Sequence, residues 1–349
     1  MLTYASPQAA LVAQVPALRG SCRLHPDTER AGHLARAWAR EVGLAADDAG
    51  EHRLRGIGGH RLAGRMFSEL SFGQLALLTR WCTWIGLLDD HWDERMRPAS
   101  AREVDDTFNS FIHCTEYDGE LASRAPLVKA FDELWRATAP PMSPDWRRRF
   151  RAGLENTRKA TLWELETRQA GLPASLAAYP AHRRATFATF IYEVGEAILG
   201  TELPHALATA QAWTDVADAA NDAAAWCNDL VSLAREQRAG SLTNHVLVAE
   251  HELGLSRAEA IDWVIHRTAE RMNDLHLAAR ALSPLYSRLA LTPATARAAS
   301  KVACAYLLVP HANLEWMTEA GRYHAAPHGT GTPHYGEEPR SSDTSGQQA

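Results

Sequence analysis

A chain of 349 residues is long enough to bury a large hydrophobic core in one domain or two. Its 42 acidic and 36 basic residues give a formal net charge of −6, which favours neither nucleic acid nor an anionic membrane surface as a partner. The five cysteines are scattered and odd in number, which argues against a disulfide framework or a zinc site and predicts reduced thiols in a cytoplasmic protein. We expect no signal peptide and no membrane span, because no apolar run has the required length or flanks.

Helical patterns follow one another along the chain from about residue 26 onwards. Residues 1–24 show no clear periodicity and contain two prolines, so we expect a loosely ordered lead-in. Residues 46–59 combine two aspartates with a glycine-rich stretch and are expected to form a loop. Helices are predicted over residues 26–44, 60–70, 71–94, 100–117, 125–138, 143–170, 177–201, 208–239, 241–253, 256–282 and 293–320.

These elements predict an all-α fold class. Strand-like alternation of β-branched residues is nearly absent, and no linker is long enough to separate two domains. We therefore expect one helical domain over residues 25–324. Residues 325–349 are rich in glycine, proline and serine and poor in apolar residues, which predicts a disordered tail.

Four carboxylates follow an apolar run in residues 81–94. Asp89 and Asp93 are one helical turn apart and share a face, and Asp90 and Glu94 form the adjacent pair. Four carboxylates within two turns repel one another, and a bound divalent cation removes that repulsion. The alternative interpretation is a charged helix end that follows a buried segment.

A second row of oxygen ligands occurs in the proline-free stretch 221–240. Asn228, Ser232 and Glu236 are spaced at i, i+4 and i+8, so in a helix they line one stripe roughly 12 Å long. An amide oxygen, a hydroxyl and a carboxylate form a hard-oxygen set that suits Mg²⁺ and leaves positions for water and phosphate oxygens. Taken alone, three polar residues on a helix are usually just its solvated side. Together with the aspartate cluster, they favour a magnesium site.

Arginines near these rows could bind a diphosphate ligand through paired N–H donors. The candidates are Arg183 with Arg184, Arg235, and Arg322 with Tyr323. Each has a simpler alternative, which is an exposed first helical turn for the first pair, a surface ion pair for Arg235, and helix-end charge for Arg322. No His-Glu-x-x-His motif, Gly-x-Ser-x-Gly elbow or phosphate loop is present, so the sequence offers no competing catalytic motif.

Several residues near the polar motifs are candidates for the wall of a substrate cavity. They are Phe67, Trp84, Thr186, Phe187, Phe190 and Trp316. Taken singly, each aromatic member is more often a core residue than part of a cavity wall.

The motifs together resemble those of bacterial class I terpene synthases. The resemblance covers roughly residues 25–324 and rests on the aspartate-rich segment 89–94, the Asn/Ser/Glu row at 228–236 and the Arg322–Tyr323 pair. Arg183 is similar in position to the family's pyrophosphate-sensing arginine. The chain departs from the family pattern where Arg235 replaces a lysine and where Thr186 and Phe187 occupy the linker and effector positions.

The resemblance implies a helical bundle around a central active-site cavity that holds three Mg²⁺ ions. The implied metal ligands are Asp89, Asp90, Asp93, Asn228, Ser232 and Glu236. Arg183, Arg235, Arg322 and Tyr323 would bind the diphosphate of a small-molecule isoprenyl diphosphate, with farnesyl diphosphate the expected substrate and a sesquiterpene the product. A monomer or a homodimer is expected.

Three alternatives stay open. The first is a diterpene synthase that uses geranylgeranyl diphosphate. The second is a chain-elongating prenyltransferase, which would need a second aspartate-rich motif in place of the row at 228–236. The third is a non-catalytic helical protein that binds diphosphate or magnesium.

Overall fold

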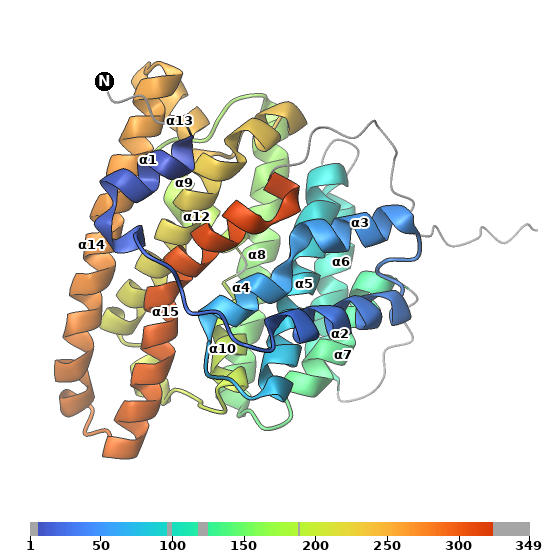
Figure 1. Ribbon diagram of the computed structural model, residues 1–349, viewed down its shortest axis with the longest axis vertical. Helices are drawn as coiled ribbons and strands as arrows, with labels where there is room; N and C mark the ends of the chain where they lie inside the picture. Colours follow the sequence, from blue (N-terminus) through green and yellow to red (C-terminus); the bar gives the residue numbers. More distant parts are fainter. Residues whose placement is uncertain (1–5, 96–99, 118–124, 188, 324–349) are drawn as a thin grey trace, which may run out of the picture.

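The computed structural model describes residues 6–95, 100–117, 125–187 and 189–323, except for the side chains of residues 93–95. Within these ranges the chain forms helices and no strand, which confirms the all-α fold class (Figure 1). The elements are α1 (Pro7–Gln14), η1 (Pro16–Leu18), α2 (Thr28–Glu41), α3 (Asp48–Ile57), α4 (Gly59–Met66), α5 (Phe72–Arg95), α6 (Ala101–Glu116), α7 (Pro126–Thr138), α8 (Pro144–Ala170), α9 (Tyr179–Thr186), α10 (Ile191–Ile198), α11 (His205–Ala208), α12 (Gln211–Ala239), α13 (His245–Leu253), α14 (Arg257–Arg288), α15 (Pro293–Glu319) and η2 (Gly321–Tyr323). None of the described helices is long and apolar enough to cross a membrane.

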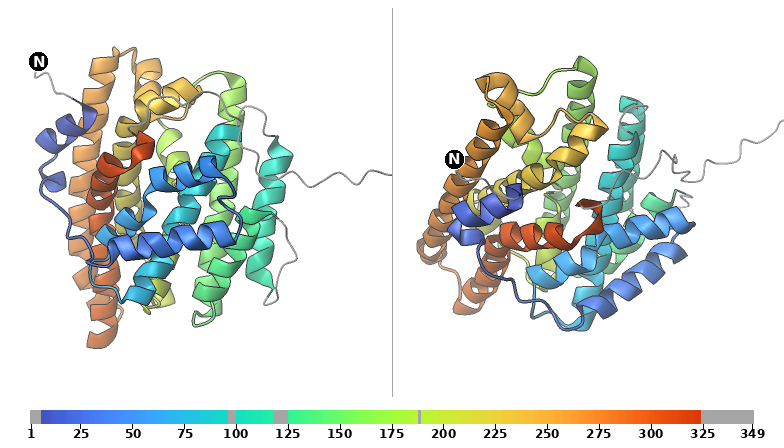
Figure 2. Two further views of the ribbon diagram at one scale, coloured as in Figure 1. Left: turned by 45° about the vertical axis from the view of Figure 1, so that its right-hand side comes forward. Right: turned by 45° about the horizontal axis from the view of Figure 1, so that its top comes forward.

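The helices form two packed halves with separate hydrophobic clusters. α14 and α15 pack on α12 in one half, and α5 packs against α2, α4 and α7 in the other. The rotated views show α14 on one side of the molecule and α6 and α7 on the other (Figure 2). Three residues, Leu62, Phe67 and Leu199, pack against both clusters. The site described below lies where the two halves meet.

The two helices that carry the oxygen rows are buried for different reasons. Trp81 and Trp84 on α5 are fully buried in a cluster of edge-to-face aromatic rings, so α5 is a core helix that ends in carboxylates. On α12 the small residues Ala219, Ala220 and Ala223 are fully buried. Side chains of this size let α14 and α15 approach α12 closely, so packing fixes the helix that carries the row.

The lead-in differs from the expectation. Ser6 caps α1 by accepting a hydrogen bond from the amide of Ala9, and proline occupies the first turn. Leu11, Val15 and Leu18 are at most 1 % exposed and pack in the cluster around α12. The prediction of a loosely ordered lead-in is therefore wrong for residues 6–18, because these apolar side chains have a partner surface on α12 and α14.

The predicted loop at residues 46–59 is also wrong, because α3 occupies it. Asp47 accepts a hydrogen bond from the amide of Gly50 at 2.7 Å and caps the helix. Gly58 ends it in the left-handed conformation with a φ of 58°. The two residue types that suggested a loop are therefore the two caps of a short helix, whose Leu54 and Ile57 are buried.

Two further expectations need correction. The predicted helix over 177–201 is broken into α9 and α10, which leaves a non-helical segment after Thr186. The predicted helix over 256–282 stops short of Pro284, but α14 continues through this proline to Arg288. The predicted tail at 325–349 lies outside the described residues.

Candidate active site

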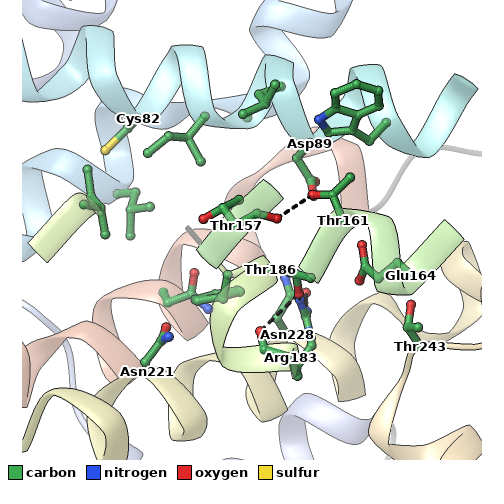
Figure 3. Close-up of a pocket in the computed structure, with 18 of the residues that line it drawn as sticks. Cys82, Asp89, Thr157, Thr161, Glu164, Arg183, Thr186, Asn221, Asn228 and Thr243 are labelled. Carbon is green, nitrogen blue, oxygen red and sulfur yellow. Dashed lines mark hydrogen bonds between the residues drawn. The ribbon is translucent and has the colours of Figure 1, made fainter. Parts of the chain in front are cut away.

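A cavity of about 200 Å³ lies between the two halves, with walls from α4, α5, α6, α8, α9, α10, α12, α15 and η2. One end of it is polar. Figure 3 shows Asp89 on α5 across the cavity from Arg183 and Asn228. The remaining wall is largely apolar, with Leu62, Ile85, Leu88, Ile191 and Val309 among its residues.

The Asn/Ser/Glu row lies on one face of α12, as the spacing predicts. Asn228 and Glu236 line the cavity, and the Ser232 hydroxyl between them donates a hydrogen bond to Glu236 Oε1 at 2.6 Å. Asn244, just before α13, donates its amide to Glu236 Oε2 at 2.9 Å and to the carbonyl oxygen of Asp229 at 2.8 Å. Both oxygens of the Glu236 carboxylate are thus held in place before any ligand binds.

Arg183 is buried against α12, which excludes the alternative of an exposed first turn. Its Nη2 donates to Asn228 Oδ1 at 2.9 Å, and its Nε donates to Asp229 Oδ1 at 2.8 Å. Tyr179 holds the other oxygen of Asp229 at 2.6 Å. Burial alone would lower the pKa of Arg183, but the adjacent Asp229 carboxylate raises it well above its ordinary value. The guanidinium is therefore a fixed positive charge beside Asn228.

Arg184 points elsewhere. Its Nε donates to Asp222 Oδ1 at 2.8 Å and its Nη1 to Asp218 Oδ2 at 2.5 Å, and it does not line the cavity. It therefore braces α9 on α12, and its candidacy for diphosphate binding is corrected.

Two guanidiniums pair with the aspartate cluster, one from η2 and one from α12. Arg322 pairs with Asp89, and its Nη2 lies 3.0 Å from Asp90 Oδ1. Arg235 on α12 has its Nη1 4.0 Å from Asp90 Oδ1 and its Nη2 3.9 Å from Glu236 Oε1. Burial raises the pKa of Asp89, but the Arg322 and Arg235 charges outweigh it and hold that pKa below its ordinary value. The side chain of Asp93 lies outside the described residues, so its place in the cluster stays a prediction.

Tyr323 completes the polar end from η2. Its hydroxyl accepts a hydrogen bond from Asn228 Nδ2 at 2.9 Å, and its ring stands edge-on to Trp316 with centroids 5.6 Å apart. Trp316 in turn donates its indole N–H to the carbonyl oxygen of Ile57 at 2.8 Å. Ile57 is the last residue of α3, so the helix that sequence patterns did not predict holds one side of the site.

Three of the predicted wall residues line the cavity and three do not. Thr186, Phe187 and Trp316 line it, and the Thr186 hydroxyl accepts a hydrogen bond from Arg183 Nη1 at 3.3 Å. Trp84 and Phe190 are fully buried in the aromatic core, and Phe67 packs between the two hydrophobic clusters. The prediction that Phe67, Trp84 and Phe190 form the wall is therefore corrected, because neighbouring helices cover their rings.

The sequence analysis missed several residues of the cavity wall, although helical spacing from the predicted metal ligands leads to some of them. Trp92 lies one turn beyond Asp89 and stacks on Phe108 with centroids 6.1 Å apart and ring planes 8° apart. This accounts for a bulky ring inside the aspartate cluster, since it continues the cavity wall. Asn221 lies two turns before Asn228 on α12 and also faces the cavity, as does Asn313 on α15. Extending each oxygen row by i−7 or i+3 would have found the residues on α5 and α12.

Comparison with known proteins gives consistent matches. Residues 80–274 match the family model described as "Terpene synthase family 2, C-terminal metal binding". The chain is 29% identical over 301 residues to (-)-delta-cadinene synthase of Streptomyces clavuligerus, covering 84% of this chain and 90% of that one. It is 28% identical over 308 residues to (+)-T-muurolol synthase ((2E,6E)-farnesyl diphosphate cyclizing) of Roseiflexus castenholzii, covering 86% and 90%. A crystal structure of a-eudesmol synthase is similar in fold, with a TM-score of 0.78 at 21% identity over 92% of this chain and 100% of that chain.

Proposed function

The chain belongs to terpene synthase family 2, whose members are lyases that act on diphosphates and use a divalent metal, and we propose that it is a Mg²⁺-dependent class I enzyme that cyclises farnesyl diphosphate to a sesquiterpene. The observation that supports this is the meeting of two oxygen rows, on α5 and α12, at the polar end of one cavity whose remaining wall is largely apolar. The farnesyl chain length is proposed because a relative over most of the chain carries that substrate in its name.

Magnesium fits the donors that the polar end offers. Asp89 and Asp90 on one side and Asn228, Ser232 and Glu236 on the other provide only hard oxygen atoms, and Ser232 Oγ lies 2.6 Å from Glu236 Oε1. We propose that these residues, with Asp93, hold three ions. Bound magnesium would neutralise the departing diphosphate and so lower the barrier to breaking the allylic C–O bond.

The basic side chains serve two partners in turn. Arg322 and Arg235 are paired with Asp89, Asp90 and Glu236 in the structure described here. A diphosphate that enters the polar end offers these guanidiniums charged oxygens with better bidentate geometry. When they turn to the diphosphate, the carboxylates become available as metal ligands. Arg183 releases the Asn228 amide oxygen in the same way.

The rest of the wall controls the carbocation. Trp92, Phe108, Phe187 and Trp316 present aromatic rings to the cavity, and their negative faces stabilise a nearby positive charge. The apolar side chains between them exclude bulk water, which would otherwise quench the cation at once. A prenyl chain that folds against this wall is therefore more readily cyclised than hydrolysed.

The test is incubation with geranyl, farnesyl and geranylgeranyl diphosphates and Mg²⁺, with analysis of volatile products and of released diphosphate. A cyclic C15 product from farnesyl diphosphate supports the proposal, and a C20 product supports the diterpene alternative. A longer diphosphate would identify a prenyltransferase, and binding without turnover a non-catalytic protein.

Two variants test the ligand assignment. Asn228→Ala and Glu236→Ala should each lose turnover while the circular dichroism spectrum stays unchanged. Unchanged turnover in either variant would reject the metal site on α12. Ala152 on the exposed face of α8 gives a matched control, since Ala152→Ser should leave turnover unaffected.

A further inference from the structure

Two asparagines lie in the cavity away from the metal-binding rows. Asn221 is seven residues before Asn228 on α12, so it lies roughly 10 Å deeper along the helix. Asn313 reaches α12 from α15 and bonds to the carbonyl oxygen of Ala224, one turn from Asn221. Figure 3 shows Asn221 and Asn228 on the same helix, both directed into the cavity. We call Asn221 and Asn313 the inner amide pair.

The hydrogen bonds of the inner amide pair fix which atom faces the cavity. Asn221 Nδ2 donates to the carbonyl oxygen of Arg184 at 2.8 Å, and Asn313 Nδ2 donates to that of Ala224 at 3.3 Å. A carbonyl only accepts, so each amide nitrogen must face it and each amide oxygen must turn away. Neither oxygen accepts a hydrogen bond from any residue in the described part of the chain.

Two such oxygens in an apolar cavity need an explanation. Asn221 and Asn313 are only 2 % and 3 % exposed, and their neighbours in the wall include Met66, Ile191 and Val309. Amide oxygens that face a cavity readily accept hydrogen bonds from water, and a buried polar group left without any partner costs about 1–3 kcal/mol. Tyr192 lines the same cavity, and its buried hydroxyl also has no partner among the described residues. These three residues line one cavity, and a water molecule hydrogen-bonded to two or more of their polar groups would be held there.

We propose that the inner amide pair holds a water molecule that captures the last carbocation, so that the product is a terpene alcohol. This inference rests on the proposed function and specifies its final step. A lone pair of the water oxygen forms a C–O bond to the cationic carbon, which yields an oxonium ion. The oxonium ion then loses one proton, for which the released diphosphate is the final base. The balance is one prenyl diphosphate and one water in, one alcohol and one protonated diphosphate out.

The depth of the pair determines which cation it can reach. The allylic carbon that ionises lies beside the metal rows, because its oxygen belongs to the diphosphate. A water held roughly 10 Å deeper is out of reach of that carbon and adjacent to the distal part of the chain. Capture therefore follows ring closure. Water bound there also stays separate from the ionisation step, so it does not hydrolyse the substrate.

The first experiment uses the unmodified protein with farnesyl diphosphate and Mg²⁺ in water enriched in ¹⁸O, with mass spectrometry of the volatiles. We expect a cyclic alcohol that carries the ¹⁸O label as the main product. A hydrocarbon as the main product, with diphosphate released, overturns the inference and leaves the proposed function intact. No turnover of any of the three diphosphates overturns the proposed function itself.

The second experiment locates the water. Asn221→Leu and Asn313→Leu keep the side-chain volume but remove the acceptor, and each should lower the alcohol-to-hydrocarbon ratio about tenfold, the effect of one lost hydrogen bond. Asn156→Leu, the same change at an exposed position on α8, should leave the ratio unchanged. If a leucine variant fails to fold by circular dichroism, Asn221→Ala or Asn313→Ala replaces it. A folded variant at each position with an unchanged ratio overturns the assignment.

Discussion

Asn244 offers a sharp test of how the site is built, because it supports Glu236 without touching substrate. It is fully buried, and its two amide N–H groups hold Glu236 Oε2 and the carbonyl oxygen of Asp229. Its amide oxygen accepts the backbone N–H of Val246 at 3.0 Å and caps α13. One side chain thus serves both folding and ligand positioning, and two substitutions separate these roles.

Asn244→Ala removes all three hydrogen bonds. Loss of the cap costs about 1 kcal/mol. Loss of donors to two buried acceptors costs about 1–1.5 kcal/mol each, so the free energy of unfolding should fall by about 3–4 kcal/mol. Asn244→Ser keeps a capping oxygen but is too short to reach Glu236. Without that donor the carboxylate turns more freely, and loss of such a supporting bond typically weakens metal affinity about 10–100-fold.

The assay is a Mg²⁺ titration of turnover with farnesyl diphosphate, paired with thermal unfolding followed by circular dichroism. Asn244→Ser should move the Mg²⁺ midpoint at least about tenfold upward with a smaller loss of stability than Asn244→Ala. Ser256→Ala is the matched control, because it removes the capping box of α14 and should lower stability with no change in the midpoint. An Asn244→Ser protein with an unchanged midpoint would refute the reasoning.

Three further predictions follow from the same contacts. Burial lowers the pKa of His245 from 6.5 to about 3. Between these two pH values only the unfolded chain binds the proton, so the free energy of unfolding falls as pH falls, by roughly 2 kcal/mol at pH 5. Denaturant melts of His245→Leu should show a flatter dependence of stability on pH. Trp316→Phe removes the hydrogen bond to Ile57 and should cost about 1 kcal/mol in a denaturant melt and lower turnover by loosening Tyr323. Gly86→Ala would place its Cβ 2.6 Å from Ile57 Cγ2 and should cost about 1–3 kcal/mol, which Ile57→Ala should relieve in a double-mutant cycle.

Helical periodicity carried the predictions that succeeded. The spacing of Asn228, Ser232 and Glu236 places them on one face of α12 whatever the neighbouring helices do, so their row follows from the sequence alone. The same holds for the end of α5, where an apolar run stops at Asp89. Such local geometry depends only on the chain being helical at that point, and no proline interrupts either helix.

The predictions that failed depend on contacts between distant segments. Trp84, Phe190 and Phe187 are all aromatic residues near a polar motif in the sequence. In the structure, neighbouring helices cover the rings of Trp84 and Phe190. Asn244 follows Glu236 by eight residues, but α12 ends between them. Helical spacing therefore cannot predict their hydrogen bond. Short helices fail for another reason, since α3 contains too few apolar positions to show a period and its caps resemble loop residues.

The pairing of charges at the polar end explains how one cavity admits both a cation and an anion. Four carboxylates, Asp89, Asp90, Asp229 and Glu236, face three guanidiniums, Arg183, Arg235 and Arg322. A diphosphate alone would draw the guanidiniums away and leave the carboxylates without a positive partner. Magnesium alone would bind the carboxylates and leave the guanidiniums without a negative partner. On the proposed function, each ligand would remove the cost that the other imposes, so we expect magnesium and diphosphate to bind with positive coupling. We therefore expect Arg322 and Arg235 to hold the carboxylates of the two rows until both ligands arrive, which would confine ionisation to the loaded site.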